Sequence, residues 1–456
     1  MPLREAGAAN SPQLSEPQPG EEELIETTPD AEAAMPSAIE ASRESARGLA
    51  AAFRALRHRN FRLFFGGQLT SLIGTWMQTV AQSWLVLKLT NSALMLGLVS
   101  FATYLPILVV TLFAGVIIDH VDRRRLIIAA QALLMLSAFV LAALTWAGRV
   151  RVEYVIILAA FNGVVASFDL PGRQAFVVEM VGIEDLPNAI ALNSMIFNGA
   201  RTIGPAVAGL LIAVTSMATC FFLNGASYLA VIWSLFAMRL PAHQRKPTGP
   251  DLWHQLRAGM AYVWSHEPTF YLLLMVTINS GFGLQYGVLI PVFARDILHG
   301  GARAYGFLMA AQGAGAVLGG ALMASRSSAG SKLRQNLFWG LTTSGAAIVI
   351  FGLSRWMWLS LIAQMIIGAG LLNFMATTNT MLQLFVTNDL RGRVMSFYTL
   401  SFIALAPLGA LLVGYIGDYG SAQAAVVLCG VIGLGCAALM LTRLKLIADA
   451  QSQLAA

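Results

Sequence analysis

The sequence contains few charged residues and few cysteines, and both shortages restrict the class of protein. Charged residues make up 11% of its 456 residues and hydrophobic residues 57%, whereas a soluble globular domain carries about 25% charged residues. The cysteines are Cys220, Cys429 and Cys436, all in apolar stretches. The last two would lie about 10 Å apart along a helix, too far for a disulfide. We therefore interpret the chain as an integral membrane protein with packing cysteines.

Several signatures of catalysis are also missing. The sequence has no P-loop, no G-x-S-x-G motif and no metal-ligand spacing of Cys or His. We therefore expect no ATP drive, no resident metal or cofactor, and no enzymatic activity. The basic surplus, a formal net charge of +6, falls at the ends of apolar runs, which is typical of a cytoplasmic membrane face. It does not indicate a nucleic-acid partner; the expected partners are the lipid bilayer and a small-molecule substrate.

Apolar windows of about 20 residues predict twelve membrane spans. The spans are expected near 62–88, 93–118, 126–147, 153–178, 188–214, 218–240, 269–294, 304–325, 336–354, 357–386, 392–416 and 421–444. The sequence thus predicts an all-α membrane protein with twelve transmembrane helices in two six-helix halves. The expected regions are a disordered tail at 1–50, rich in Glu, Ala, Ser and Pro, the halves 55–240 and 269–446, the linker 241–268 and a tail at 447–456.

Basic residues and internal similarity add orientation and symmetry. With both termini in the cytoplasm, nineteen basic residues flank the spans on the inner side and six on the outer side, which predicts this orientation. A shift of about 204 residues aligns Gly115 with Gly319 and Asp185 with Asp389. Such a repeat is typical of transporters that have a central site between two halves.

The linker contains apolar residues at helical spacing. They are Trp253, Leu256, Met260, Val263 and Trp264. This pattern predicts an amphipathic helix, which either lies on the cytoplasmic leaflet or packs on the protein itself.

The short connection between the second and third spans carries a family motif. It reads Gly115-Val-Ile-Ile-Asp119-His-Val-Asp122-Arg123-Arg-Arg. Together with the twelve spans, it resembles the major facilitator superfamily over about residues 55–445. The family has a basic residue at His120 and a glycine at Asp122. The aspartate followed by three arginines is similar to an exporter branch that includes the enterobactin exporter and related drug:proton antiporters.

The resemblance implies roles for these residues in a cytoplasmic gate. Asp119 is expected to meet the positive N-terminal end of the eleventh helix, near Gly392. Arg123 is expected to meet Asp169, placed at the cytoplasmic end of the fourth span. These contacts would form when the gate is closed and break as the halves rock.

A second motif lies in the fifth span. Gly204, Pro205 and Gly209 are similar to the antiporter motif of drug exporters in this superfamily, although alanines replace some of its glycines. Pro205 interrupts the helical hydrogen bonds and Gly209 permits close helix packing. The motif is therefore expected to seal a helix interface, and the alternative is ordinary small-residue packing.

Polar residues inside the apolar spans are candidates for the substrate cavity. The candidates are Ser71, Gln78 and Gln82 in the first span, Arg201 in the fifth, Asn279 and Tyr286 in the seventh, and Asn373 and Thr377 in the tenth. For each single residue an interhelical hydrogen bond is an equal alternative. A charge at mid-span costs about 3 kcal/mol or more, so Arg201 needs a partner. It is interpreted as a binding residue, with a structural ion pair or a carbonyl contact as alternatives.

These features predict a transporter of the bacterial inner membrane that exports a small amphipathic molecule, such as a drug-like compound or a siderophore. Alternating access and exchange for protons are implied by the resemblance. The residues themselves do not show proton coupling, since no Asp or Glu lies at mid-span in the first or seventh helix. Arg201 would suit an anionic group on the substrate. A lipid or lysophospholipid flippase on the same fold is the alternative, followed by a membrane sensor or scaffold that transports nothing.

Overall fold

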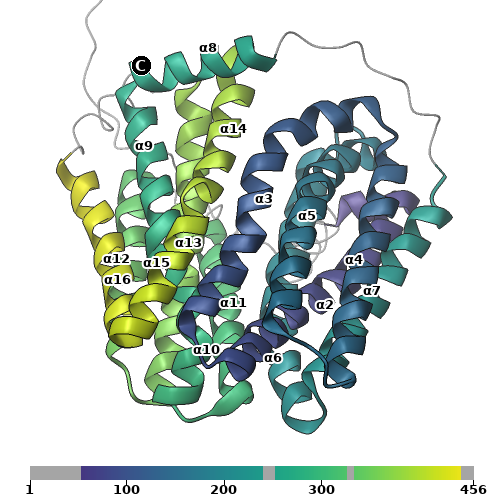
Figure 1. Ribbon diagram of the computed structural model, residues 1–456. Coiled ribbons are helices and arrows are strands. Elements are labelled where there is room, and N and C mark those ends of the chain that lie inside the picture. Colours follow the sequence, from purple (N-terminus) through teal and green to yellow (C-terminus); the bar gives the residue numbers. More distant parts are fainter. Residues whose placement is uncertain (1–52, 240–251, 326–332, 443–456) are drawn as a thin grey trace, which may run out of the picture. The chain divides into compact units, whose positions relative to one another are not determined.

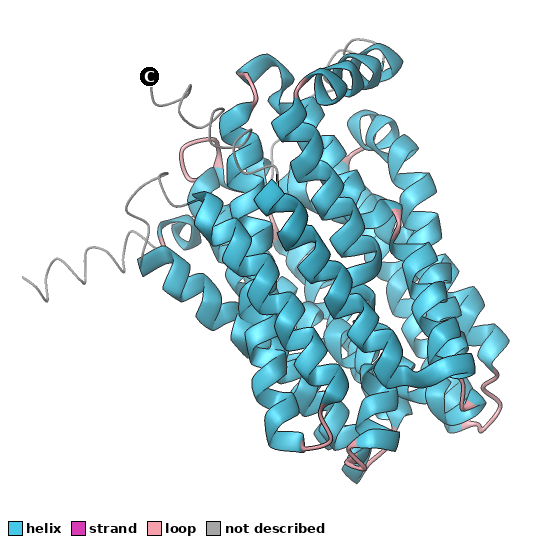
Figure 2. Ribbon diagram, turned by 90° about the vertical axis from the view of Figure 1, so that its left-hand side faces the viewer, coloured by secondary structure: helices cyan, strands magenta, loops and turns pink. Residues whose placement is uncertain are grey.

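The computed structural model describes residues 53–239, 252–325 and 333–442, and every regular element in these ranges is helical (Figures 1 and 2). The first half comprises η1 (Arg54–Arg57), α2 (Arg59–Thr90), α3 (Ala93–His120), α4 (Arg123–Trp146), α5 (Val152–Val181), α6 (Leu186–Val214) and α7 (Met217–Ala237). After α8 (Leu252–Ser265), the second half comprises α9 (Glu267–Ile278), η2 (Asn279–Gly283), η3 (Leu284–Leu289), α10 (Ile290–Val292), η4 (Phe293–Ile297), α11 (Gly301–Ser325), α12 (Leu333–Leu353), α13 (Met357–Phe385), α14 (Asn388–Ala404), α15 (Ala406–Ile416), η6 (Gly417–Ser421) and α16 (Ala422–Thr442). The predicted tails 1–50 and 447–456 lie outside the described residues.

Capping residues explain the tight hairpins at the start of the first half. Asn91 ends α2 in the left-handed conformation, with φ of 52°, which asparagine tolerates better than most residues. Ser92 then begins α3 by accepting a hydrogen bond from the backbone nitrogen of Met95 at 3.2 Å. Asp122 begins α4 by accepting one from the nitrogen of Arg125 at 3.2 Å. Asp122, the second aspartate of the loop motif, is therefore a helix N-cap.

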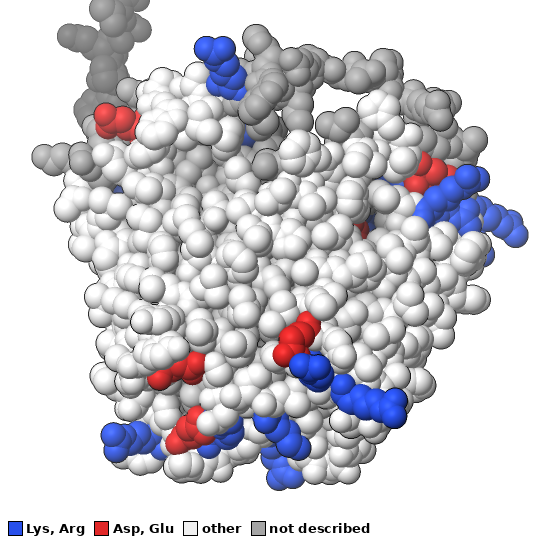
Figure 3. Space-filling model, in the orientation of Figure 1, with Lys and Arg blue, Asp and Glu red and all other residues white. Residues whose placement is uncertain are grey.

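The prediction of an all-helical membrane protein is confirmed. Among the described residues, ten stretches are long and apolar enough to cross a membrane. One of these, Leu390–Thr442, covers α14, α15 and α16 together, and α2 is not among the ten. The count of twelve spans therefore stays a prediction. On the face shown in Figure 3, charged side chains lie toward the two ends and leave a broad uncharged band between them.

The helix α8 lies across one end of the bundle (Figure 1). We call this the α8 end and the opposite end, where α10 lies, the α10 end. The hydroxyl of Tyr262 donates a hydrogen bond to the carbonyl of Phe385 at 3.1 Å, and Val263 is buried. Met260 and Trp264 are exposed. One side of α8 thus packs on the second half, and contact of its other side with a membrane stays a prediction.

The buried apolar residues of the described ranges form clusters that differ between the two ends. One cluster at the α10 end draws on both halves and includes Leu85 and Leu96 from the first half and Phe293 and Val413 from the second. Toward the α8 end, one cluster around Phe176 belongs to the first half and another belongs to the second half and α8. The halves therefore share a core at the α10 end and have separate cores toward the α8 end.

Candidate functional site

Asp418, in η6, connects the two halves at the α10 end. Its carboxylate accepts hydrogen bonds from the backbone nitrogens of Ala93 at 2.5 Å and Leu94 at 3.0 Å, and from the hydroxyl of Ser92. The first turn of a helix has backbone N–H groups without helical partners and a partial positive charge. A carboxylate from the second half thus caps helix α3 of the first half. Sequence reasoning did not single out Asp418.

Two further contacts join the halves at this end. The guanidinium of Arg295 in η4 donates to the carbonyl of Leu87 in α2 at 3.4 Å. The rings of Trp84 and Tyr305 stack with a centroid distance of 6.4 Å. Together with the Asp418 cap, they join the two halves at the α10 end.

The motif Gly204-Pro205…Gly209 lies where α6 meets α2 and α11. A Cβ on Gly204 would stand 2.8 Å from the carbonyl oxygen of Ile73, and one on Gly209 would stand 3.0 Å from the Cα of Gly306 in α11. Such separations leave little or no room for a side chain, so the glycines permit this close approach. The position fits a sealed interface, and the sealing role stays a prediction.

Near the middle of the molecule, polar side chains form a chain of hydrogen bonds that crosses from one half to the other. The Nη2 of Arg201 in α6 donates to the Oε1 of Gln312 in α11 at 2.9 Å. The amide of Gln312 then donates to the hydroxyl of Tyr286 at 2.6 Å, and that hydroxyl donates to Gln364 in α13 at 3.1 Å. The structure therefore brings together Arg201 and Tyr286, two predicted cavity residues, through Gln312. Gln312 and Gln364 were not among the candidates, although a glutamine in an apolar span is itself a signal.

Arg201 has other neighbours, but no carboxylate among them. Its guanidinium carbon lies 5.7 Å from the centroid of the Trp76 ring, and Trp76 packs edge-on against Phe197. The Nε of Arg201 is buried without a hydrogen-bond partner, and no ion pair of Arg201 is found in the described part of the chain. The alternative of a structural ion pair is thus not found among the described residues.

The polar face of the first span packs differently from the prediction. Ser71 and Gln78 are buried, and the Oε1 of Gln78 accepts a hydrogen bond from Asn224 of α7 at 2.7 Å. A Cβ on Gly74 would stand 2.7 Å from the Oδ1 of Asn224. Ser71 and Gln78 thus sit in the packed α2–α7 core, so their placement in an open cavity is wrong for this structure. Small residues on this face let α2 and α7 approach closely, and the interhelical alternative applies. Gln82, nearer the end of α2, is half-buried, and its role stays a prediction.

The remaining candidates lie in the second half. Asn373 donates to the carbonyl of Asn336 in α12 at 3.0 Å and accepts from Thr377 at 3.2 Å. These two residues bond to each other and to a neighbouring helix, and the structure does not bring them to Arg201. Asn279 begins the π-helical turn η2, where its buried Nδ2 has no hydrogen-bond partner among the described atoms. Helical irregularities of this kind are frequent at functional sites.

The predicted gate pair is replaced by another pair. Arg123 lies 2.6 Å from Glu179, whereas the predicted partner, Asp169, accepts hydrogen bonds from Arg173 and, at 2.9 Å, from Gln131. This structure therefore lacks the pair of Arg123 with Asp169, and because that contact is expected only with the cytoplasmic gate closed, it stays a prediction for that state. Asp169 lies about 18 Å along α5 from its end at Val181, and Glu179 is the carboxylate level with the start of α4.

The other two residues of the gate motif, Gly115 and Asp119, belong to α3. Their side-chain surroundings lie outside what the structure describes. The expected contact of Asp119 with the start of the eleventh helix, which is α14 here, therefore stays a prediction.

Asp169 itself occupies the middle of α5. It is buried and forms an ion pair with Arg173, four residues further along the same helix. Sequence reasoning placed this carboxylate at the cytoplasmic end of the fourth span, and its position well before the end of α5 at Val181 corrects that placement. An ionisable residue at membrane depth is a candidate functional group.

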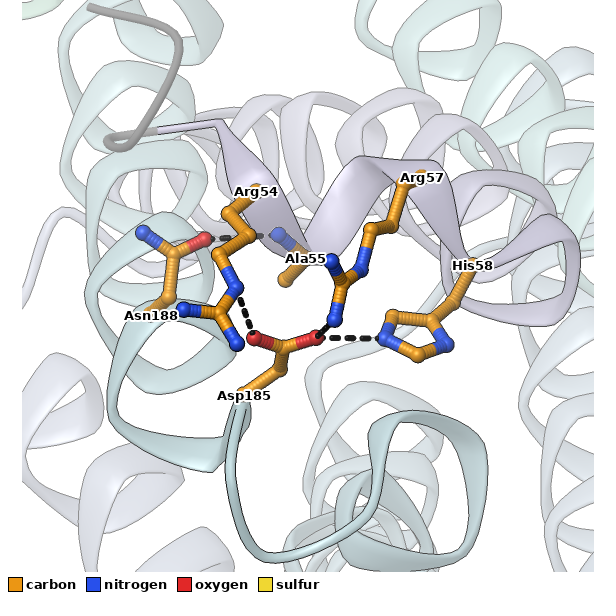
Figure 4. Close-up of polar contacts among 6 residues, drawn as sticks. All are labelled: Arg54, Ala55, Arg57, His58, Asp185 and Asn188. Atoms are coloured by element: carbon orange, nitrogen blue, oxygen red, sulfur yellow. Dashed lines mark hydrogen bonds and ion pairs between the residues drawn. The ribbon is translucent and has the colours of Figure 1, made fainter. Parts of the chain in front are cut away.

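A second buried carboxylate, Asp185, fixes the segment that precedes α2 (Figure 4). Its oxygens lie 2.7 Å from Arg54, 2.8 Å from Arg57 and 2.6 Å from the Nε2 of His58. The hydrogen bond with His58 is the largest influence that holds the pKa of Asp185 below its ordinary value, and the two arginines act in the same direction. Sequence reasoning used Asp185 only as a landmark of the repeat.

The residues that the structure describes contain no group of three His, Cys, Asp or Glu side chains able to hold a metal ion. The three cysteines are buried and free. The polar arrangement around Arg201 and Asp169 is suited to binding and to charge compensation, and it offers no nucleophile paired with a base.

Comparison with known proteins gives a family. The model of the transmembrane secretion effector family matches residues 50–456. The staphyloferrin A transporter of Staphylococcus aureus is 26% identical over 252 residues, which cover 54% of this chain and 62% of that protein. The multidrug efflux pump Tap of Mycolicibacterium fortuitum is 26% identical over 388 residues, which cover 83% of this chain and 94% of the pump. A mutant of the peptide transporter POT has the same fold, with a TM-score of 0.69 and 12% identity over 86% of this chain and 95% of that one.

Proposed function

The chain belongs to the transmembrane secretion effector family of the major facilitator superfamily, and on that premise we propose that it is an efflux transporter of the bacterial inner membrane. Its cargo is a small amphipathic molecule. Support comes from relatives that are named as a multidrug efflux pump and as a staphyloferrin A transporter. The alignment with the second of these spans only 62% of that protein.

The proposed transporter crosses the membrane twelve times with both termini in the cytoplasm. Six crossings are α2 to α7, and the other six are the segment Glu267–Ile297, α11, α12, α13, α14 with α15, and α16. The 32 residues of α2 extend over about 48 Å, which exceeds the hydrocarbon thickness of about 30 Å. The arginines at the start of α4 lie at the α8 end, which makes that end cytoplasmic.

Alternating access is the proposed mechanism, and one observation carries it. The two halves share a hydrophobic core at the α10 end and have separate cores toward the α8 end. Two bodies that are joined at one end can rock about the central region, because each keeps its own core as the contacts between them change. With the α10 end outside, this conformation is closed to the exterior by the Asp418 cap and the packing of Gly209 on Gly306.

Proton exchange is the proposed energy source, and Asp169 is the proposed proton carrier. It is a buried carboxylate at mid-helix, held by Arg173 and Gln131. While Arg173 stays close, its positive charge compensates the negative charge of the carboxylate. Movement of α5 against α4 would break the hydrogen bond from Gln131 of α4, and rotation of the Arg173 side chain away from Asp169 would then leave a buried carboxylate that binds a proton.

The function is tested by transport into proteoliposomes that contain the purified chain and a pH-sensitive dye. Ethidium, rhodamine 6G and 1-anilinonaphthalene-8-sulfonate serve as probes under an imposed pH gradient. We expect at least one probe to accumulate, with proton movement in the opposite direction. Asp169→Asn should retain downhill movement of the probe but lose accumulation driven by the gradient.

Each result bears on a separate part of the proposal. Transport of a probe without any proton movement would refute the exchange mechanism. Absence of transport for every probe, together with movement of labelled lysophosphatidylcholine between leaflets, would favour the flippase alternative. Gradient-driven accumulation by Asp169→Asn equal to that of the unmodified chain would remove Asp169 as the carrier.

A further inference from the structure

We propose that Arg201 binds an anionic group of the transported molecule, so that the preferred substrates are small acids with an apolar, aromatic body. This inference rests on the proposed efflux function, because it assigns the substrate class of the same central site. The group recognised is a carboxylate or a sulfonate, and the residues that receive it are Arg201 and Trp76.

The first argument is the missing counter-ion. Arg201 lies in the middle of α6, which runs from Leu186 to Val214, and a charge at that depth is costly unless an anion compensates it. Arg173, an arginine that is likewise half-buried within an apolar span, has the carboxylate of Asp169 as its ion partner. In the described ranges, Arg201 has only a neutral amide, that of Gln312. The site therefore carries an uncompensated positive charge, and a substrate anion supplies what the protein lacks.

The second argument is the unused hydrogen-bonding capacity of the guanidinium. A guanidinium has five N–H donors in a planar fork that suits two parallel hydrogen bonds to one carboxylate. The Nη2 of Arg201 donates to Gln312, while its Nε is buried and has no partner among the described atoms. Arg201 is nevertheless only half-buried as a whole residue. Part of its fork is therefore held in place and part is available to a ligand.

The third argument concerns the body of the ligand. The guanidinium lies 5.7 Å from the centroid of the Trp76 ring, which holds it in position by a cation–π contact. An acid that meets Arg201 would thus contact the aromatic ring of Trp76 on the adjacent helix α2. A cation of the same size would be repelled at the same place, so the charge also selects between ligands.

A pair of fluorescent probes with one skeleton tests the proposal. 1-Anilinonaphthalene-8-sulfonate carries a sulfonate, and N-phenyl-1-naphthylamine has the same ring system without it. Binding of each to the full chain in nanodiscs is measured by quenching of tryptophan fluorescence, with empty nanodiscs subtracted. We expect the unmodified chain to prefer the anionic probe by about tenfold or more, the value of one charged hydrogen bond.

Arg201→Gln should remove this preference and leave binding of the neutral probe within about twofold, because the amide keeps a polar contact but has no charge. Arg201→Lys should restore part of the preference. Arg149→Gln is the matched control. Arg149 is exposed in the loop between α4 and α5, and its replacement removes the same charge from the surface. We expect that control to retain the preference of the unmodified chain.

Thermal unfolding separates a binding role from a structural one. If Arg201 serves the ligand, Arg201→Gln without any probe should unfold no earlier than the unmodified chain, because an uncompensated buried cation has been removed. The anionic probe should raise the melting temperature of the unmodified chain and not that of Arg201→Gln.

Two outcomes overturn the proposal. One is equal affinity of the unmodified chain for both probes. The other is an equal loss of affinity for both probes in Arg201→Gln, together with unfolding at a lower temperature. These outcomes are distinct from failure of the proposed function, which is judged by transport of ethidium and rhodamine 6G. Export of those cations with no preference for the acid would refute the anion site alone.

Discussion

The carboxylate of Asp418 lies 2.5 Å from the backbone nitrogen of Ala93, so the end of one helix in the second half caps the beginning of α3 in the first. The predicted gate lies at the other ends of the same two membrane segments, which are α3 and the segment formed by α14 and α15. There, Asp119 of α3 is expected to meet the start of α14. The two aspartates would then act at opposite ends of one helix pair. Each would stabilise the conformation that is closed at its own end.

Replacement of Asp418 by alanine should open the α10 end more often. Loss of a helix-capping side chain changes stability by about 1 kcal/mol, which corresponds to a factor of about five in the ratio of two conformations. Spin labels on the exposed positions Lys88→Cys and Ser421→Cys, one in each half, report the separation at this end. We expect a larger fraction of long distances in Asp418→Ala than in the unmodified background.

Glu153→Ala provides the control for this measurement. Glu153 pairs with Arg151 at 3.3 Å within the first half, so its loss removes a similar charge without touching a contact between the halves. A distance distribution that changes equally in both variants, or in neither, would contradict the role of Asp418.

The pairing of Arg123 with Glu179 predicts an energetic coupling that can be measured. The two side chains are 15% and 33% exposed, so solvent screens the pair and the coupling should be about 0.5–1 kcal/mol. A double-mutant cycle with Arg123→Gln and Glu179→Gln, read out as the free energy of unfolding, measures it. The same cycle with Asp169→Asn in place of Glu179→Gln should give a coupling near zero. A larger coupling to Asp169 would restore the pair that the sequence predicts.

The sequence predicts most of the helices because hydropathy and capping are local properties. The stretch Ala93–His120, for example, is delimited by Ser92 and by the charged loop that follows it. Helix length is predicted closely even for α5, because the expected span 153–178 nearly matches Val152–Val181. The error concerns Asp169, which sequence reasoning assigns to the cytoplasmic end although the helix continues from it to Val181.

The candidate site is less predictable, because it depends on which faces of the helices meet. Arg201 is recognisable from its place in an apolar run, but its partner Gln312 is more than a hundred residues away in sequence. The polar face of α2 has the pattern of a cavity lining, and small residues on that face instead permit close packing, as the approach of Gly74 to Asn224 illustrates. A helical pattern shows that a face points away from lipid, and it does not distinguish a cavity from a neighbouring helix.

Asp185 predicts a dependence of stability on pH. Its pKa lies below the ordinary value of 3.8, so the folded state favours the ionised carboxylate. The stabilisation is therefore fully present above that value and is lost as the pH falls through the lowered pKa. The melting temperature of Asp185→Asn should be below that of the unmodified chain at pH 7, and the difference should shrink as the pH falls below about 4.

The exposed neighbour Glu184 supplies the control for the pH series. Glu184→Gln removes the same charge one residue earlier, outside the contacts with Arg54, Arg57 and His58. We expect little change in melting temperature at either pH. A difference between Asp185→Asn and the unmodified chain that stays constant across the pH range would show that the carboxylate acts through its shape and not through its charge.

The ion pair of Asp169 and Arg173 allows stability and coupling to be separated. Asp169→Asn leaves Arg173 buried without its anion, and the loss of one partner of a buried pair destabilises a protein by about 3–5 kcal/mol. The double variant Asp169→Leu with Arg173→Met removes both charges and should recover most of that loss, measured by unfolding in mixed micelles. If the pair served packing alone, the double variant would also recover proton-driven accumulation of the probe. We expect it to fold and to move the probe downhill without using the proton gradient, because the only carboxylate at the middle of a described α-helix of the first half would be gone.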